Sequence, residues 1–473
     1  MVSRWDSNLF RDFIMNIVSV RRFATRSAFV LALGLGAGAC DKAINVEPRN
    51  SVSSDTGFTT KEDAAAGLLG AYDATQSADY MGLAYPSLVD LIAGEIRFVG
   101  TFTTTYGVTA QNQVLPDNIQ VGNTWSAIYT AIHRTNYLIQ ESEKISDPAF
   151  PKQSTIAQAR ALRAYHYMNL LALWGGTSEG YGYTGGLGVP LRLKPTVDIG
   201  PDTKPIARSS EAEVAAAIRA DLDYAIDNLA VGTGNRITKN SAQALRARFE
   251  LRMRNYADAL RFANLVPVPA GFATAVPTGT TTPDAIWQLA FSSTDQNSYA
   301  FYWYPSPGGR NEFDPGAALA AAHPAGDKRL AVNVVTGGTN QKYTRTSTRD
   351  DPFNSIRYAE VALTIAEAAA QTNDLATATT QLNIIRSRAG LSPTTATTAS
   401  ALVADILLQR RLELAYEGMY WFDLRRTNRV QSVLGTVPPA TPNAYNQSFR
   451  NLFPLPLREI NLATDILVQN PGY

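Results

Sequence analysis

Residues 410–426 read RRLELAYEGMYWFDLRR and decide how the rest of the chain is interpreted. Arg410, Glu413 and Glu417 are spaced one helical turn apart, so opposite charges are expected to meet along one helix face. The end of the stretch supplies apolar anchors and then two cations where positive charge suits a helix end: Trp421, Phe422, Leu424, Arg425 and Arg426. The stretch therefore predicts a structural element built on buried rings and paired charges.

The same stretch contains acidic residues that a glycoside hydrolase would need in pairs. Glu413 could pair with Glu417 or with Asp423. A general acid needs a raised pKa, whereas neighbouring arginines keep carboxylates ionised. The charges are therefore interpreted as structural, and no catalytic residue is assigned.

Outward from this stretch, the apolar residues recur with helical spacing at 64–72, 125–136 and 157–168, and Ser210 with Glu213 forms a capping-box pattern before a helix near 210–229. Two segments read as helical hairpins of one kind. Ala247, Tyr256 and Ala259 have offsets of 0, 9 and 12, which the triplet Ala366, Leu375 and Ala378 repeats. Small residues where helices cross favour tetratricopeptide-like pairs, although any tight helical hairpin can show them.

Three stretches rich in polar and turn-forming residues interrupt this helical pattern, near 80–122, 175–205 and 267–350. Loops of this length in a compact protein are usually functional. The predicted fold is mostly α: a tetratricopeptide-like helical-hairpin scaffold with large irregular loop insertions and a few short strands, in a single body over 55–473.

Several segments together resemble the SusD/RagB family of nutrient-binding outer-membrane lipoproteins. The resemblance is carried, in the family's order, by residues 161–164, 174–176, 357–368, 382–391, 410–426, 453–460 and 470–473. It implies a non-catalytic cell-surface protein that captures an oligosaccharide. It also implies delivery of that ligand to a SusC-like TonB-dependent outer-membrane transporter, with the protein as a lid on the barrel. A peptide-binding member of the family is the alternative.

The N-terminus has the pattern of a secretory signal. Basic residues precede an uncharged apolar run over 28–39, which is too short to span a bilayer and is followed by Cys40. Gly38-Ala39-Cys40 resembles a lipobox, although Ala37 stands where Leu is usual. We expect a signal peptide over 1–39, with Met15 as an alternative start, lipidation of Cys40 and a tether over 40–54. A plain signal peptide with an incidental cysteine is the alternative.

Composition and motifs argue against nucleic-acid binding and against metal or phosphate sites. The 42 Lys and Arg balance 41 Asp and Glu, so nucleic acid is not an expected partner. The three histidines are isolated in sequence, and neither zinc-protease nor phosphate-loop motifs occur. No cofactor or metal site is predicted.

Aromatic residues in the insertions are the strongest candidates for ligand contact. Sugar rings stack on aromatic planes, and their hydroxyls need polar partners. Residues 299–304 read YAFYWY and precede an arginine and an asparagine. They are expected to form a short strand that points Tyr299, Phe301 and Trp303 one way and Tyr302 and Tyr304 the other. The candidates are Trp303, Tyr302, Tyr304, Tyr299, Arg310, Asn311, Tyr85 and Tyr181. Packing of the same rings into a loop core is the alternative.

Two rival functions stay open at the level of sequence. A secreted glycoside hydrolase would need two converging carboxylates from the insertions, and the available residues are Asp90, Glu95, Glu179 and Glu312. A purely structural tetratricopeptide adaptor would bind a partner protein and no small ligand.

Overall fold

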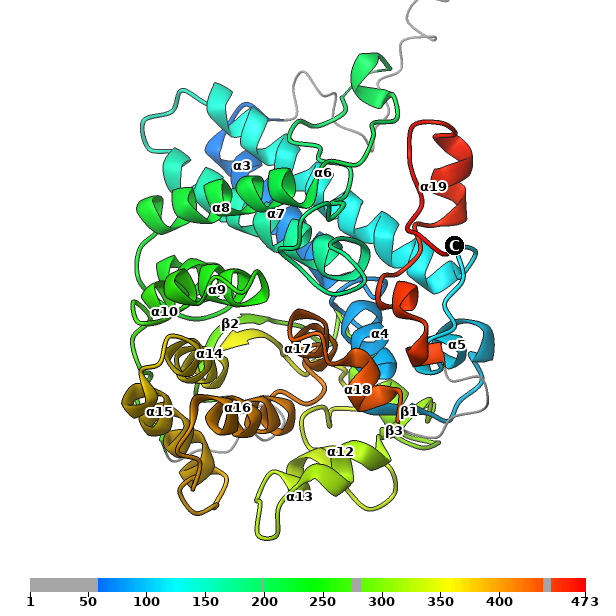
Figure 1. Ribbon diagram of the computed structural model, residues 1–473. Helices are drawn as coiled ribbons and strands as arrows, with labels where there is room; N and C mark the ends of the chain where they lie inside the picture. Colours follow the sequence, from blue (N-terminus) through cyan, green and yellow to red (C-terminus); the bar gives the residue numbers. More distant parts are fainter. Residues whose placement is uncertain (1–57, 198, 274–281, 437–443) are drawn as a thin grey trace, which may run out of the picture. The chain divides into compact units, whose positions relative to one another are not determined.

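The computed structural model describes residues 58–197, 199–273, 282–436 and 444–473 (Figure 1). Residues 59–473 form one compact unit. The predicted signal peptide, the lipidated Cys40 and the tether lie outside the described residues. None of the described helices is both long enough and apolar enough to cross a membrane.

The first part of the unit is a layer of long helices. α3 (Lys61–Gln76) packs against α6 (Ile119–Lys144), α6 packs against α7 (Lys152–Trp174), and α7 packs against α8 (Glu211–Asn228) (Figure 1). The predicted capping box is confirmed, because the Ser210 hydroxyl accepts from the Glu213 N–H and the Glu213 carboxylate accepts from the Ser210 N–H. The helical periodicity thus located these helices correctly.

Both predicted hairpins are confirmed. α9 (Lys239–Arg252) pairs with α10 (Tyr256–Ala263), and α14 (Tyr358–Gln371) pairs with α15 (Leu375–Arg388). Each turn holds one residue in the left-handed region, Arg254 at φ 61° and Asn373 at φ 65°. The small residues at the predicted offsets are buried where the helices meet: Ala247, Ala259, Ala366 and Ala378. Because α14 also packs on α10 and on α16 (Ala399–Glu413), the pairs stack as the tetratricopeptide-like interpretation predicts.

The insertions contain more regular structure than the sequence analysis anticipated. Residues 80–122 include α4 (Ala84–Ile92), β1 (Ile96–Phe98), the π-helical η1 (Thr103–Gly107), α5 (Val108–Ala110) and the start of α6. The stretch 267–350 includes β2 (Ala285–Leu289), α11 (Tyr299–Trp303), β3 (Phe313–Pro315), α12 (Ala317–Ala322) and α13 (Leu330–Asn333). The described part of the stretch 175–205 is largely irregular, with isolated β-bridges and the 3-10 turn η2 (Pro201–Thr203).

Strand pairing closes these insertions onto the helices. β1 pairs antiparallel with β3, and β2 pairs antiparallel with β4 (Phe353–Arg357), which leads directly into α14. Both sheets therefore join segments more than 60 residues apart in sequence, and such pairing is not visible in local periodicity.

The stretch 410–426 forms a helix end, a turn and a second helix, which corrects one prediction. α16 ends at Glu413 and α17 spans Tyr420–Arg426, with Tyr416 at φ 63° between them. Glu417 therefore lies in the turn and shares no helix face with Arg410. The left-handed residue redirects the chain, and Gly418 then passes close to Pro86.

The charges of this stretch are paired inside the protein. Arg357, at the end of β4, donates to the Glu413 carboxylate at 2.8 Å and to Glu417 at 2.9 Å. Arg410 and Arg426 donate to Asp423 at 3.0 and 2.8 Å. We call Arg357, Glu413, Glu417, Asp423 and the arginines bonded to them the buried charge network.

The arginines decide the ionisation of the network. Burial alone would raise the pKa of Glu413, but Arg357, Arg388 and Arg329 hold it below its usual value. The pKa of Asp423 is lowered in the same way, because Arg410 and Arg426 outweigh the effect of burial. The network therefore fixes the path of the chain with ionised carboxylates.

The chain ends with short elements packed near α4 and α7: α18 (Val430–Leu434), η3 (Ala444–Asn446), η4 (Ser448–Asn451) and α19 (Leu457–Leu462). The Phe453 N–H donates to the Leu173 carbonyl, and the Trp174 indole donates to the Pro454 carbonyl. These bonds tie the C-terminal segment to the end of α7.

Candidate functional site

The pairing of β1 with β3 brings two insertions together. Phe98 lies opposite Phe313, so the segment after β1 meets the segment before β3. The Val99 N–H continues this contact by donating to the Glu312 carbonyl at 2.9 Å. Residues 101–106 and 301–312, two hundred positions apart in sequence, consequently form one surface.

Aromatic rings make up the centre of this surface. Phe102 and Tyr302 stack with ring centroids 6.2 Å apart and an interplanar angle of 12°. Tyr106 and Phe313 lie beneath them, with Tyr106 edge-on to both Tyr302 and Phe313. Phe102 and Tyr302 are half-buried while Tyr106 and Phe313 are buried, so the upper pair keeps part of its ring area open to solvent.

Charged groups hold the aromatic pair in place. The guanidinium of Arg310 lies 4.1 Å from the ring centroid of Phe102 and donates to the Glu312 carboxylate at 2.7 Å. Glu312 in turn accepts from the Thr101 N–H at 2.8 Å and from the Thr101 hydroxyl at 3.0 Å. Burial would raise the pKa of Glu312, but the bonds from Arg310 and Thr101 lower it. An ionised Glu312 therefore orients Arg310 across the Phe102 ring.

Other polar groups next to the rings are available to a ligand. Among the described residues, neither the Tyr302 hydroxyl nor the Asn311 side chain has a hydrogen-bond partner. A second arginine, Arg349, lies 3.8 Å from the ring centroid of Phe301, which neighbours Tyr302. We call Thr101, Phe102, Phe301, Tyr302, Arg310 and Arg349 the aromatic surface.

The predicted strand over 299–304 is wrong, because residues 299–303 form the short helix α11. In a helix, residues four apart share a face, so Tyr299 and Trp303 point together into the protein. Phe301 and Tyr302 lie on the other side and are half-buried. Helical rather than alternating geometry thus decides which rings reach the surface.

Of the eight ligand-contact candidates in the insertions, the structure places four at or near the aromatic surface and four in the core. Tyr302, Arg310, Asn311 and Tyr304 are half-buried or exposed. Trp303 is 1% exposed and packs on Tyr416, with ring centroids 4.7 Å apart. Tyr299 stacks on Tyr343 and donates to the Met81 carbonyl at 2.7 Å. For these two rings the packing alternative describes the structure.

Tyr85 and Tyr181 are likewise core residues. Tyr85 is buried and donates to the Asn169 carbonyl at 3.1 Å. Tyr181 donates to the Ala172 carbonyl at 2.6 Å and accepts from Arg425 at 2.9 Å. Their rings lie on loops or short helices that fold inward, which a polar sequence neighbourhood did not reveal.

Sequence reasoning missed Phe102 and Arg349. Phe102 stands alone among threonines in the sequence TFTTTY at 101–106, and an isolated apolar ring in a polar loop was the available signal. Nothing in the sequence indicates Arg349, because its role depends on a contact with the Phe301 ring that only the fold creates.

The four carboxylates considered for a hydrolase have different environments. Asp90 and Glu95 are buried, and Glu95 is paired with Arg411 at 2.8 Å. Burial raises the pKa of Glu95 to about 7, against the opposing effect of Arg411. Glu179 is exposed, and Glu312 is engaged by Arg310 and Thr101. Within the described ranges no three His, Cys, Asp or Glu side chains are grouped to hold a metal ion.

Two family models and a known protein match this chain in sequence. Residues 328–473 match the model described as SusD family, and residues 46–251 match the model described as starch-binding associating with outer membrane. The SusD-like protein P38 of Formosa agariphila is 26% identical over 522 aligned positions, which cover 92% of this chain and 98% of that protein.

Solved structures share the fold. A SusD superfamily protein from Bacteroides vulgatus aligns with a TM-score of 0.75 at 20% identity, covering 88% of this chain and all of that chain. A laminarin binding SusD-like protein aligns with a TM-score of 0.71 at 20% identity, again over 88% of this chain and 100% of that one.

Proposed function

This chain belongs to the SusD family, and from that premise we propose that it captures an oligosaccharide on the aromatic surface and delivers it without chemical change to an outer-membrane transporter. Cys40 would carry the lipid that holds the protein on the outer membrane, facing the cell exterior. The partner would be a SusC-like TonB-dependent barrel.

One observation carries the binding proposal. The stacked and partly open rings of Phe102 and Tyr302 are fixed by Arg310, and they lie beside the unpaired Tyr302 hydroxyl. A pyranose offers an apolar face to such rings, while its hydroxyls bond to arginine and phenol groups. The platform is formed before the ligand arrives, so little ordering entropy is lost on binding.

The comparisons favour a glycan over a peptide as the first ligand to test. One matching family model is described as starch-binding, and one structural neighbour is described as laminarin binding. The partly open apolar area is a narrow stack of rings rather than a groove along a free sheet edge, which is how an extended peptide is commonly held.

Isothermal titration of the purified protein with maltohexaose and laminarihexaose tests the proposal. Tyr302→Ala and Phe102→Ala are expected to weaken binding at least about tenfold, since each removes a stacking plane. Tyr183→Ala is the matched control, because Arg254 also covers the Tyr183 ring, at 3.9 Å, away from the aromatic surface. Equal affinity in all three variants, or binding of peptides only, contradicts the glycan proposal.

Transport and anchoring need separate tests. Labelled palmitate should be incorporated by the parent protein and not by Cys40→Ala, and the transporter should co-purify with the anchored protein. Incubation of the pure protein with either hexasaccharide should release no reducing ends. New reducing ends that disappear in a Glu312→Gln variant would favour the hydrolase instead.

A further inference from the structure

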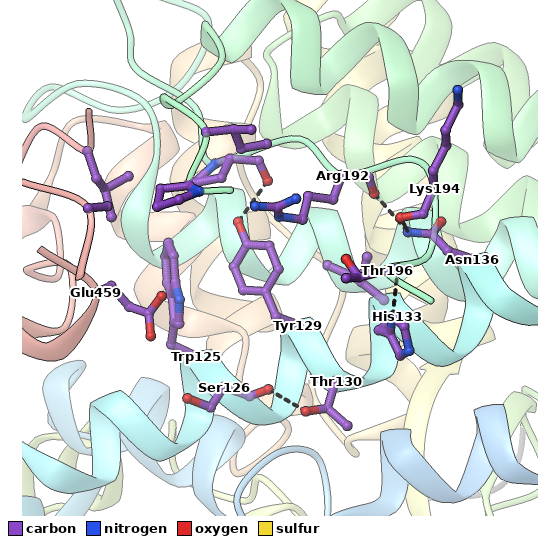
Figure 2. Close-up of a pocket in the computed structure, with 16 residues that line it drawn as sticks. Trp125, Ser126, Tyr129, Thr130, His133, Asn136, Arg192, Lys194, Thr196 and Glu459 are labelled. Carbon is purple, nitrogen blue, oxygen red and sulfur yellow. Dashed lines mark hydrogen bonds between the residues drawn. The ribbon is translucent and has the colours of Figure 1, made fainter. Parts of the chain in front are cut away.

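A concavity of about 430 Å³ lies away from the aromatic surface. Its walls are one face of α6, residues 190–196 with 205–206, and the C-terminal residues 459–467 (Figure 2). None of its lining residues belongs to the aromatic surface. The volume falls within the range of pockets that bind small molecules.

The floor of this pocket is a fixed aromatic ring. Tyr129 is half-buried, and its hydroxyl donates to the Pro190 carbonyl at 2.8 Å. Trp125 lies against it with ring centroids 4.9 Å apart, and Trp174 supports Trp125 edge-on. Because its hydroxyl is bonded, the Tyr129 ring is held in one orientation and can present a plane to a ligand.

The wall opposite α6 is also held in place. Asn136, buried on α6, donates to the carbonyls of Arg192 and Lys194 at 3.0 and 3.3 Å. The Arg192 guanidinium donates to the carbonyls of Asp202 and Lys204 at 2.8 and 2.6 Å. These bonds hold residues 192–194 against α6 and residues 202–204 against Arg192, so the pocket exists without a ligand.

Polar groups lie at both ends of the ring. Figure 2 shows Glu459 beyond Trp125 on one side of Tyr129, and His133 and Thr196 on the other, while the Lys194 side chain extends away from the ring. In the part of the chain that the structure describes, the Glu459 carboxylate has no hydrogen-bond or ion-pair partner.

His133 adds a donor at the second end. Its Nδ1 accepts from the Thr196 N–H at 3.4 Å. The neutral ring must then carry its proton on Nε2. Burial and the neighbouring Arg134 lower the pKa of His133, so the neutral form prevails at pH 7.

We propose that this pocket is a second saccharide-binding site, in which a sugar ring stacks on Tyr129 and its hydroxyls bond to Glu459 at one end and to His133 at the other. A carboxylate accepts from neighbouring hydroxyls, while an imidazole N–H donates to them. This proposal does not rest on saccharide binding at the aromatic surface, because the two sites share no residue.

A saccharide suits the pocket better than an apolar side chain of a partner protein. An apolar group would cover the Tyr129 ring equally well, but it would separate the Glu459 carboxylate from water without replacing its hydrogen bonds. A sugar offers an apolar face and a hydroxyl rim together, which matches a ring flanked by acceptor and donor groups.

The test is crystallography of the protein soaked in maltohexaose or laminarihexaose, combined with titration of variants. We expect sugar density against Tyr129 and at least about tenfold weaker binding at this site in Tyr129→Ala. Glu459→Gln, which preserves shape, should weaken binding about threefold to tenfold by replacing a charged acceptor. Glu143→Gln is the control, because Glu143 lies on α6 but outside the pocket. This variant should bind the sugars with the affinity of the parent protein.

The outcomes separate the two sites. Tyr302→Ala should abolish only binding at the aromatic surface, and Tyr129→Ala only binding at the pocket. Sugar bound at the aromatic surface with an empty pocket overturns this inference and leaves the proposed function standing. Sugar bound in the pocket with none at the aromatic surface overturns the proposed function alone. The second site is overturned if neither sugar occupies the pocket at millimolar concentration. It is also overturned if Tyr129→Ala and Glu459→Gln both bind the sugars with the affinity of the parent protein.

Discussion

The buried charge network and the aromatic surface use the same residue types for different ends. In the network, Arg357 contacts Glu413, Glu417 and Asp284 with its side chain fully buried. On the aromatic surface, Arg310 contacts Glu312 alone among the carboxylates that the structure describes, and it keeps 43% of its side chain exposed while lying over Phe102. An arginine whose N–H groups bond to buried carboxylates has a structural role. An arginine that lies over a ring and is partly exposed can still bond to a ligand.

The rings show the same contrast over two adjacent residues. Trp303 is surrounded by Tyr416 and Phe313, whereas Tyr302 keeps one side open next to Phe102. Both residues lie on helix α11, so their exposure differs because the two side chains point in different directions. Aromatic content therefore located the region of the surface but did not identify the rings that a ligand can reach.

The largest expected effect comes from breaking the buried charge network. Arg357→Met should lower the free energy of unfolding by about 3–5 kcal/mol, because Glu413, Glu417 and Asp284 would lose a buried partner. Urea unfolding measures the loss. Arg310→Met on the aromatic surface should cost less than about 1 kcal/mol. Similar losses in both variants would remove the distinction between the two regions.

Trp303→Ala should rank second, with a loss of about 3–4 kcal/mol from the cavity left beside Tyr416. Tyr302→Ala, one residue earlier, should cost about 1 kcal/mol because the ring of Tyr302 is only partly buried. Thermal unfolding of the pair compares them directly. A larger loss in Tyr302→Ala would reverse the assignment of core and surface.

The third expected effect is a loss of stability at low pH, when the carboxylates of the buried charge network become protonated. The folded-state pKa values of Glu413, Glu417 and Asp423 lie below their unfolded values of 4.5, 4.5 and 3.8. Their stabilisation is therefore complete above those unfolded values and is lost as pH falls toward the folded ones. The unfolding free energy should therefore decline as the pH falls below about 5, and urea unfolding at a series of pH values measures the decline.

Glu413→Gln gives the check on that pH dependence. It should be less stable at pH 7 and show a shallower acid slope, since one shifted carboxylate is gone. Tyr302→Ala should keep the parent slope, because no carboxylate of the network contacts its ring. An unchanged slope in Glu413→Gln would show that the acid sensitivity arises elsewhere.

The smallest expected effect is Arg310→Lys. Lysine keeps the positive charge but loses the planar stacking over Phe102 and the oriented bond to Glu312. Affinity for the hexasaccharide should fall about threefold to fivefold, with the unfolding free energy changed by less than about 0.5 kcal/mol. Calorimetry and urea unfolding of the same sample give both values, and a large loss of stability would place Arg310 with the network.

Local sequence determined much of the helical scaffold. The spacing of small and apolar residues located α6 to α9 and both hairpins, since helix formation depends on neighbours three and four positions away. The capping pair Ser210 and Glu213 is local in the same sense. The resemblance carried by 410–426 likewise agreed with the family found by comparison.

Tertiary structure decided what local patterns could not. The turn at Tyr416 took Glu417 off its predicted helix face, and the pairing of β1 with β3 placed Phe102 beside Tyr302. Exposure of a ring and saturation of an arginine depend on residues that are distant in the sequence. The sequence by itself thus determined the helices of the scaffold and the ionic composition of this protein, because both depend on residue types and local spacing, whereas the fold alone decided which aromatic rings remain open to a ligand.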